Sequence, residues 1–275
     1  MSSPLQPVPA APPDPTPEVF TPPPSPGLVP REAPIFGLLD VLLVLVAGVF
    51  LVLIIPALAV VAAHMLPRYA GVPLTALARN AVILVPAQSV AYLLLIAFTH
   101  MLMITRHDRG LTDVIPFAWP RERWAALVAA GVLLAVAILM LGQFLPIPQQ
   151  LPIDEFFKTR SSAFVMLVFA VLVAPIVEEL LFRGLLYPVL NRALGAIAAL
   201  VLTSLAFALL HAGQLALAWA PLLTLFLVGF VLTLVRARYQ SVMASTLVHM
   251  AYNTTLFGVI LLQTGGFRNM DAFNR

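Results

Sequence analysis

Residues 163–183 read AFVMLVFAVLVAPIVEELLFR, and this stretch decides how the chain folds. Its first twelve residues carry no polar side chain, yet Glu178, Glu179 and Arg183 follow within the same apolar run. A charged side chain near the centre of a bilayer raises the free energy of insertion by roughly 2.5–3.5 kcal/mol. These three groups must therefore be paired, reached by water, or placed at a membrane boundary.

The composition of the 275-residue chain is that of a membrane protein. Hydrophobic residues make up 61% of it and charged residues 10%, whereas soluble domains are about 25% charged. Several apolar segments are long enough to cross a hydrocarbon core of about 30 Å. They are expected at residues 35–63, 77–104, 123–145, 161–190, 194–213, 217–236 and 240–263. We therefore predict an all-α fold, a polytopic transmembrane bundle of about seven helices.

Composition also excludes several kinds of chemistry. The chain has no cysteine, which rules out disulfides, thiolate metal sites and cysteine nucleophiles. Its formal net charge is +3, but the basic residues are scattered between apolar runs, as in proteins that are oriented by their loops. We expect the lipid bilayer to be a partner and nucleic acid not to be one, while the oligomeric state is left open.

Residues 1–34 have the composition of a disordered tail. They contain 13 of the 25 prolines, and proline tracts favour extended or disordered chain because they donate no backbone hydrogen bond. A docking segment for a proline-binding partner is the alternative to a solvated tail. The transmembrane domain is expected to span residues 35–275.

The loop after the second segment holds the densest cluster of arginines, Arg106, Arg109, Arg121 and Arg123. Placing this loop in the cytoplasm predicts a cytoplasmic amino terminus. The same choice puts Arg236 among the basic residues on the cytoplasmic side. The arginine, alanine and proline bias suggests a GC-rich bacterial genome, hence a bacterial inner membrane.

Three apolar segments each carry polar groups at helical spacing. Glu179 and Arg183 are four residues apart and can form a salt bridge, whereas Glu178 points about 100° away. Pro175, one turn earlier, frees a carbonyl and can kink the helix. The next pairs are Phe207 with His211, and His249 with Asn253. Taken singly, each set has a structural explanation as a helix-end cap or an interhelical hydrogen bond.

Together these sets predict one polar cavity. If the fourth and fifth segments are antiparallel, Glu178 and His211 lie at similar depth, roughly 20–27 Å from the turn that joins them. A carboxylate in such a cavity can act as a general base for water, and histidines can orient that water or bind a metal. An amide can stabilise an oxyanion. Serine and zinc-protease motifs are absent, so hydrolysis by activated water fits best.

The pattern Glu178-Glu179-x-x-x-Arg183, Phe207-x-x-x-His211 and His249-x-x-x-Asn253, in that order, resembles the CAAX protease and bacteriocin-processing family. This family of intramembrane endopeptidases includes the type II CAAX prenyl endopeptidases. The resemblance covers about residues 161–262. It implies that Glu178 activates water with His211, that Glu179 and Arg183 complete the acidic motif, and that Phe207 shapes the substrate pocket.

The resemblance further implies that His249 and Asn253 stabilise the oxyanion or complete a coordination shell. Family members are described both as metalloproteases and as metal-independent glutamate proteases. Zn²⁺ held by Glu178, His211 and His249 is therefore a possible cofactor, and a metal-free mechanism is the other possibility. The expected substrate is a membrane-associated or lipidated peptide.

Two other functions are consistent with the sequence. A non-catalytic immunity or scaffold protein would keep the same fold. A proton-coupled transporter would also use intramembrane carboxylates and histidines, although no repeat symmetry is visible.

Overall fold

The structure is a computed structural model that describes residues 35–269, and within this range the secondary structure is entirely helical. The predicted disordered tail, residues 1–34, lies outside the described residues. The all-α prediction is confirmed, because apolar runs of this length satisfy their backbone hydrogen bonds as helices in lipid.

Six helical stretches in the described range are long and apolar enough to cross a membrane. They are α1 (Leu38–His64), α3 (Ala81–His107), α5 (Trp124–Gly142), the continuous stretch Arg160–Leu194, α10 (Trp219–Tyr239) and α11 (Val242–Gln263). The expected segment 194–213 forms α9 (Ala196–Leu210), which has 15 residues. At 1.5 Å per residue α9 is only about 22 Å long, shorter than the roughly 30 Å hydrocarbon core. The protein is therefore an integral membrane protein with one helix shorter than a full span.

The connectors carry short helical turns. They are η1 (Pro67–Tyr69), α2 (Leu74–Leu77), α4 (Leu111–Val114) and η2 (Pro152–Phe157). The last of these touches the loop after α9, because the backbone N–H of Ile153 donates to the carbonyl of Gln214 over 3.2 Å. The η2 turn and the end of α9 therefore lie at the same end of the bundle.

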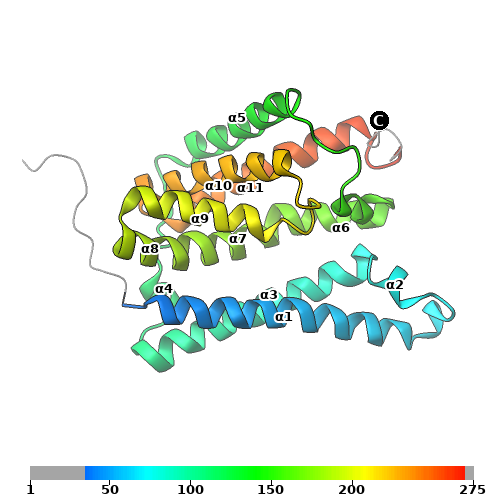
Figure 1. Cartoon of the computed structure of the whole chain (residues 1–275), viewed down its shortest axis with the longest axis horizontal. Helices are drawn as coiled ribbons and strands as arrows, with labels where there is room; N and C mark the ends of the chain where they lie inside the picture. The colour runs from blue at the N-terminus through cyan, green and yellow to red at the C-terminus, as the bar shows by residue number, and fades with distance from the viewer. Residues whose placement is uncertain (1–34, 270–275) are drawn as a thin grey trace, which may run out of the picture. The chain divides into compact units, whose positions relative to one another are not determined.

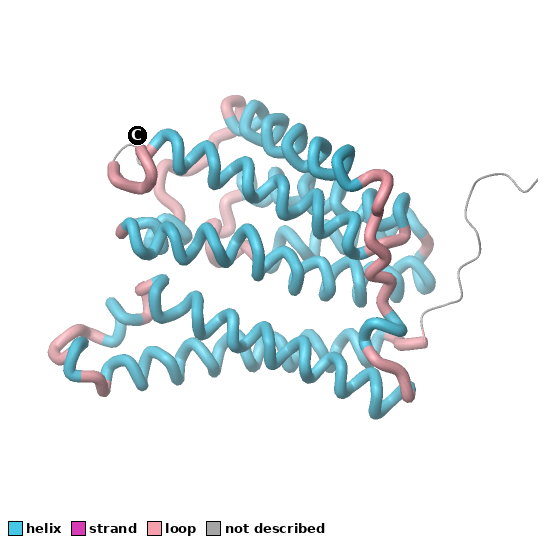
Figure 2. Tube along the Cα trace, turned by 180° about the vertical axis from the view of Figure 1, so that it is seen from behind, coloured by secondary structure: helices cyan, strands magenta, loops and turns pink. Residues whose placement is uncertain are grey.

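The central stretch 160–194 lies between two groups of helices (Figures 1 and 2). On one side α1 packs along α3, and on the other α11 packs along α5 and α9 along α10. The central stretch contacts α3 through its first part, α11 through its middle and α9 through its end. This arrangement encloses the middle of the stretch, where Glu178 and Glu179 lie.

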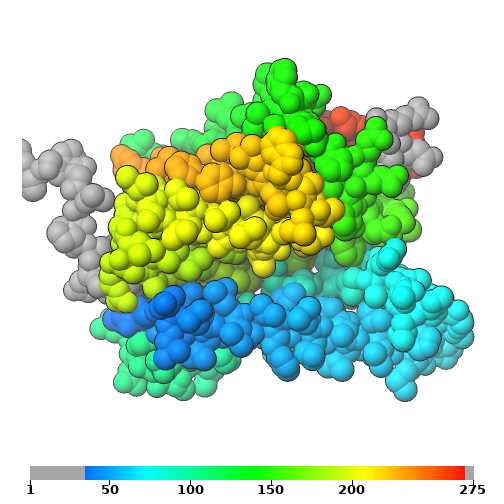
Figure 3. All heavy atoms as spheres, viewed as in Figure 1, coloured from blue at the N-terminus to red at the C-terminus, as the bar shows by residue number. Residues whose placement is uncertain are grey.

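The outer faces of the bundle are apolar. In α1 the side chains of Val46, Phe50 and Leu53 are 67%, 61% and 64% exposed, and α1 forms one edge of the molecule (Figure 3). Exposed apolar side chains over the length of a helix match a hydrocarbon environment. The faces that carry them are the lipid-facing surface of the bundle.

Two π-helical turns interrupt the central stretch, and each is followed by a proline. The order is α6 (Arg160–Val168), η3 (Phe169–Val173), α7 (Ala174–Glu179), η4 (Leu180–Leu186) and α8 (Tyr187–Leu194). In these turns an N–H bonds to the carbonyl five residues earlier, as Ala174 does to Phe169 and Tyr187 to Phe182. Pro175 and Pro188 come next and have no N–H to continue this pattern.

The carbonyls that the prolines leave open receive side chains from other helices. In the π register a backbone N–H at position 175 would donate to the Ala170 carbonyl, but proline has none. The Nδ2 of Asn253 donates to this carbonyl instead, over 2.6 Å. Pro188 would pair with Arg183, and the Nε of Arg236 donates to the Arg183 carbonyl over 3.0 Å. The Glu178–Glu179 segment is thus held on both sides by hydrogen bonds from α10 and α11. Buried carbonyls need such partners.

Candidate active site

Glu178 and Glu179 differ in how far each is enclosed. Both lie on α7 at the centre of the bundle, but Glu178 retains 7% of its exposure and Glu179 retains none. A general base must be reached by the water whose proton it takes. Glu178 is therefore the more accessible of the two carboxylates, and Glu179 is fully enclosed.

Arg183 fixes Glu179. Its Nη1 lies 2.9 Å from Glu179 Oε1, the i,i+4 pair that the sequence predicts. Its Nη2 donates to the carbonyl of Gly229 over 2.7 Å, and its Nε donates to the hydroxyl of Thr233 over 3.2 Å. The guanidinium carbon also lies 4.7 Å from the centre of the Phe207 ring. Arg183 is fully buried, and these contacts compensate for the removal of its charge from water.

Glu179 in turn orients His249. The Nδ1 of His249 lies 3.0 Å from Glu179 Oε1, while its Nε2 lies 3.8 Å from Glu178 Oε2. Because the ionised carboxylate only accepts hydrogen bonds, Nδ1 carries the hydrogen. In the neutral imidazole, the Nε2 lone pair of His249 then points toward Glu178.

His211 lies beside the other carboxylate oxygen of Glu178. Its Nδ1 donates to the carbonyl of Phe207 over 2.9 Å, and its Nε2 lies 3.9 Å from Glu178 Oε1. A carbonyl accepts only, so this histidine has the same tautomer as His249. Both imidazoles thus turn an Nε2 lone pair toward one carboxylate.

Each gap between Nε2 and the carboxylate of Glu178 is too long for a direct hydrogen bond. Two groups that only accept hydrogen bonds also repel each other unless a hydrogen lies between them. A polar separation above about 3.5 Å commonly holds a bridging water. The arrangement is suited to a water molecule that donates one hydrogen to Glu178 and the other to an imidazole.

Phe207 packs against both histidines. Its ring centre lies 5.1 Å from that of His211 and 5.8 Å from that of His249. Gly229 of α10 allows this packing, because a Cβ at that position would lie 3.1 Å from Phe207 Cδ1. Phe207 therefore sets the positions of the two imidazoles.

Asn253 lies one turn after His249 on α11. One hydrogen of its Nδ2 is engaged with the Ala170 carbonyl, so the amide supports the helix that carries Glu178. The oxyanion role of Asn253 stays a prediction, for which the second Nδ2 hydrogen is available.

Residues 160–255 match the model of the Rce1-like type II CAAX prenyl endopeptidase family. All seven residues predicted for the site lie within this match. This part of the chain is therefore similar to the CAAX protease family. No curated protein and no solved structure matches the chain. At the level of the family, this match supports a CAAX-protease-like intramembrane endopeptidase.

Glu178, His211 and His249 were predicted as possible zinc ligands. Across residues 35–269, no three histidine, aspartate or glutamate side chains are grouped so that they could hold a metal ion. Histidines that bind a metal through one ring nitrogen commonly donate the N–H of the other to a protein oxygen. His211 and His249 both make such an Nδ1 contact. Zinc binding by Glu178, His211 and His249 therefore stays a prediction.

Three residues of the candidate site were missed by the sequence analysis, and all lie on α10. Gly229 and Thr233 accept hydrogen bonds from Arg183, and Arg236 donates to its backbone. Their spacing puts them near one face of α10, a signal that was available in the sequence. Arg236 was counted among the basic residues of the cytoplasmic side, which stays a prediction; its side chain is only 3% exposed, because its guanidinium donates to the carbonyl that Pro188 leaves open.

Proposed function

We propose that the protein cleaves a peptide bond in a membrane-associated or lipid-anchored substrate, using water activated by Glu178. The observation that carries this proposal is the pair of gaps of 3.9 and 3.8 Å between the Glu178 oxygens and the Nε2 atoms of His211 and His249. This geometry suits one water molecule that contacts the Glu178 carboxylate and an imidazole Nε2 at the same time.

In the proposed reaction Glu178 takes one proton from the water, while an imidazole Nε2 accepts a hydrogen bond from the O–H group that remains on the water oxygen. The water oxygen attacks the carbonyl carbon of the scissile bond and forms a tetrahedral intermediate. Protonated Glu178 then gives its proton to the leaving nitrogen, and the carbon–nitrogen bond breaks. A positioned general base contributes about 10²–10⁴-fold to such a rate.

The free Nδ2 hydrogen of Asn253 is the proposed donor to the developing oxyanion. Removal of one such donor lowers the rate by about 10²–10³-fold where it has been measured. Glu179 and Arg183 position His249 and do not touch the reacting atoms.

The end of the bundle that carries His211 is the proposed entry for water. The His211 side chain is 19% exposed, more than that of Glu178 or His249, and it lies where α9 ends in a loop. We place the protein in a bacterial inner membrane with a cytoplasmic amino terminus, on the arginines of the connector after α3. The proposed partner is a peptide or protein within that membrane.

The proposal is tested with the purified full chain in detergent and a library of lipid-anchored peptides, with products identified by mass spectrometry. Wild type should cleave, and Glu178→Ala should not. Treatment with a chelator separates the metal-free mechanism, which predicts unchanged cleavage, from a zinc mechanism, which predicts its loss. Equal product patterns from wild type and Glu178→Ala would contradict the proposal and support a non-catalytic protein.

A further inference from the structure

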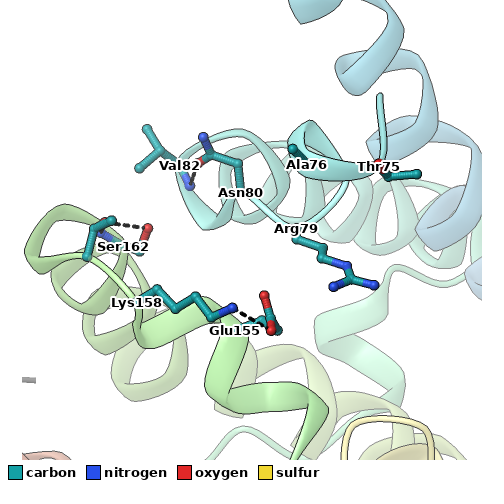
Figure 4. A pocket seen from close by; sticks show the side chains of 9 residues that line it. Thr75, Ala76, Arg79, Asn80, Val82, Glu155, Lys158 and Ser162 are labelled. Atoms are coloured by element: carbon teal, nitrogen blue, oxygen red, sulfur yellow. Dashed lines mark hydrogen bonds and ion pairs between the residues drawn. The ribbon is translucent and has the colours of Figure 1, made fainter. Parts of the chain in front are cut away.

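A polar cavity of about 700 Å³ opens at one end of the bundle (Figure 4). Its two walls come from the starts of α3 and α6: Arg79 lies in the turn before α3, Glu155 and Lys158 lie before α6, and Ser162 lies in the first turn of α6. Ser162 precedes Glu178 by sixteen residues, which is about 24 Å along a helix. The cavity is therefore separate from the candidate active site.

The cavity lies at a membrane boundary. Two membrane-crossing stretches begin beside it, at Ala81 and at Arg160. Charged residues before the start of an apolar span belong at the level of the lipid headgroups. Ligands of the cavity can therefore come from the bilayer as well as from water.

The cavity already stabilises an anion. The Glu155 carboxylate lies between the Lys158 ammonium and the Arg79 guanidinium (Figure 4), and Lys158 Nζ is 2.6 Å from Glu155 Oε1. The hydrogen bond from Lys158 lowers the pKa of Glu155, and the positive charge of Arg79 acts in the same direction. The Lys158 side chain is 65% exposed, and such exposed ion pairs are weak enough to be exchanged for another anion.

Further donors surround this position. Within the described part of the chain Arg79 forms no salt bridge, so its planar set of N–H groups can bind two oxygens of one phosphate. The hydroxyl of Ser162 accepts a hydrogen bond from Thr159 over 2.9 Å, which leaves its own hydrogen to donate. An ammonium, a guanidinium and a hydroxyl together suit a group with several charged oxygens.

An apolar strip continues from the cavity along α3. Val82 lines the cavity and is 40% exposed, and Leu93, three turns later, is 67% exposed. Eleven residues of helix return the side chain to within about 20° of the same face. Pro86, between them, is also exposed. The strip can accommodate an acyl chain below a bound headgroup.

We propose that this cavity binds the phosphate group of an anionic phospholipid, between Arg79 and Lys158, with an acyl chain along the Val82–Leu93 face of α3. The site is independent of the proposed protease activity. A free phosphate ion shares the headgroup chemistry but would gain nothing from the apolar strip.

The test is a titration of the full chain in detergent with phosphatidylglycerol, read by native mass spectrometry. Each basic residue near a headgroup contributes about fivefold to affinity, so Arg79→Ala/Lys158→Ala should weaken binding about 25-fold. Arg68→Ala is the matched control, because Arg68 lies in η1 at the same end and stacks only on Tyr69. Unchanged affinity in the double variant would overturn the proposal.

Glu155→Gln gives a result that misfolding cannot imitate. It removes the carboxylate that now pairs with Lys158, so it should tighten phosphatidylglycerol binding about fivefold. Weaker binding by this variant would contradict the site. Inorganic phosphate should bind far more weakly than the lipid, and equal affinity would overturn the lipid assignment. Cleavage by Arg79→Ala/Lys158→Ala should match wild type if the site is independent.

Discussion

Replacement of Arg183 by methionine should destabilise the protein strongly, because the change leaves a buried carboxylate without its cation. Arg183 and Glu179 are both fully buried, and the Nη1–Oε1 distance is 2.9 Å. Removal of one partner of a buried pair lowers stability by about 3–5 kcal/mol. We expect Arg183→Met to lower the free energy of unfolding by that amount.

The structure locates the source of this loss. The Gly229 carbonyl keeps a donor without Arg183, because the Thr233 hydroxyl lies 2.7 Å from it. Glu179 keeps the Nδ1 hydrogen of His249 and the nearby Ser245 hydroxyl, which are both neutral donors and do not replace a cation. Most of the loss should therefore come from the charge of Glu179. The double variant Glu179→Gln/Arg183→Met should recover a large part of it, since the buried charge is then absent.

The free energy of unfolding can be measured in mixed micelles by titration with a denaturing detergent, followed by tryptophan fluorescence. Arg160→Met is a suitable control, because Arg160 is an exposed arginine on the same helical stretch. A loss below about 1 kcal/mol for Arg183→Met, the range of an exposed pair, would refute the reasoning. A double variant as unstable as the sum of the single variants would refute it too.

Four other substitutions test the architecture of the site. His211→Ala and His249→Ala should each lower turnover at least about 10²-fold, measured on one peptide, because each imidazole holds the proposed water; normal turnover by either would exclude a shared site. Asn253→Ala should lower both the melting temperature and the turnover, since the Ala170 carbonyl loses its donor; an unchanged melting temperature would contradict this. Gly131→Ala should lower stability by about 1–3 kcal/mol through overpacking.

The last of these changes has a clear steric basis. A Cβ on Gly131 of α5 would clash with the Val248 carbonyl and lie 2.6 Å from Ala251 Cβ, beside His249 on α11. Gly258→Ala on α11 is the control, because a Cβ there meets nothing within 4 Å. Melting curves that are the same for both variants would show that α5 and α11 do not approach as described.

Much of the fold could be predicted from the sequence because lipid leaves few options for an apolar run. The segments predicted at 35–63 and 240–263 agree closely with α1 and α11. The early segment at 77–104 was predicted to begin too soon, because α2 is a separate turn before α3. Helix ends depend on local capping, such as the Asn80 side chain that accepts from Val82 N–H, and apolar periodicity does not report it.

The candidate site was accessible from the sequence where its residues repeat at helical spacing. Glu179 and Arg183 pair as their four-residue spacing predicts. The spacing of Arg236 places it on the same face of α10 as Gly229 and Thr233, but its hydrogen bond to the Arg183 carbonyl could not be predicted, because that bond depends on the π register before Pro188 and on a neighbouring helix. Sequence patterns predict that an arginine near a helix end is exposed to solvent, because they do not reveal a buried backbone carbonyl on another helix that lacks a donor.

The central claim is that Glu178 acts as the base for water, and single-turnover kinetics test it most directly. Glu178→Gln keeps the size of the side chain and removes its basicity, so the fold should be retained. The rate of cleavage of one identified peptide should fall by about 10²–10⁴-fold relative to wild type. A folded Glu178→Gln protein that cleaves within about tenfold of the wild-type rate would contradict the account.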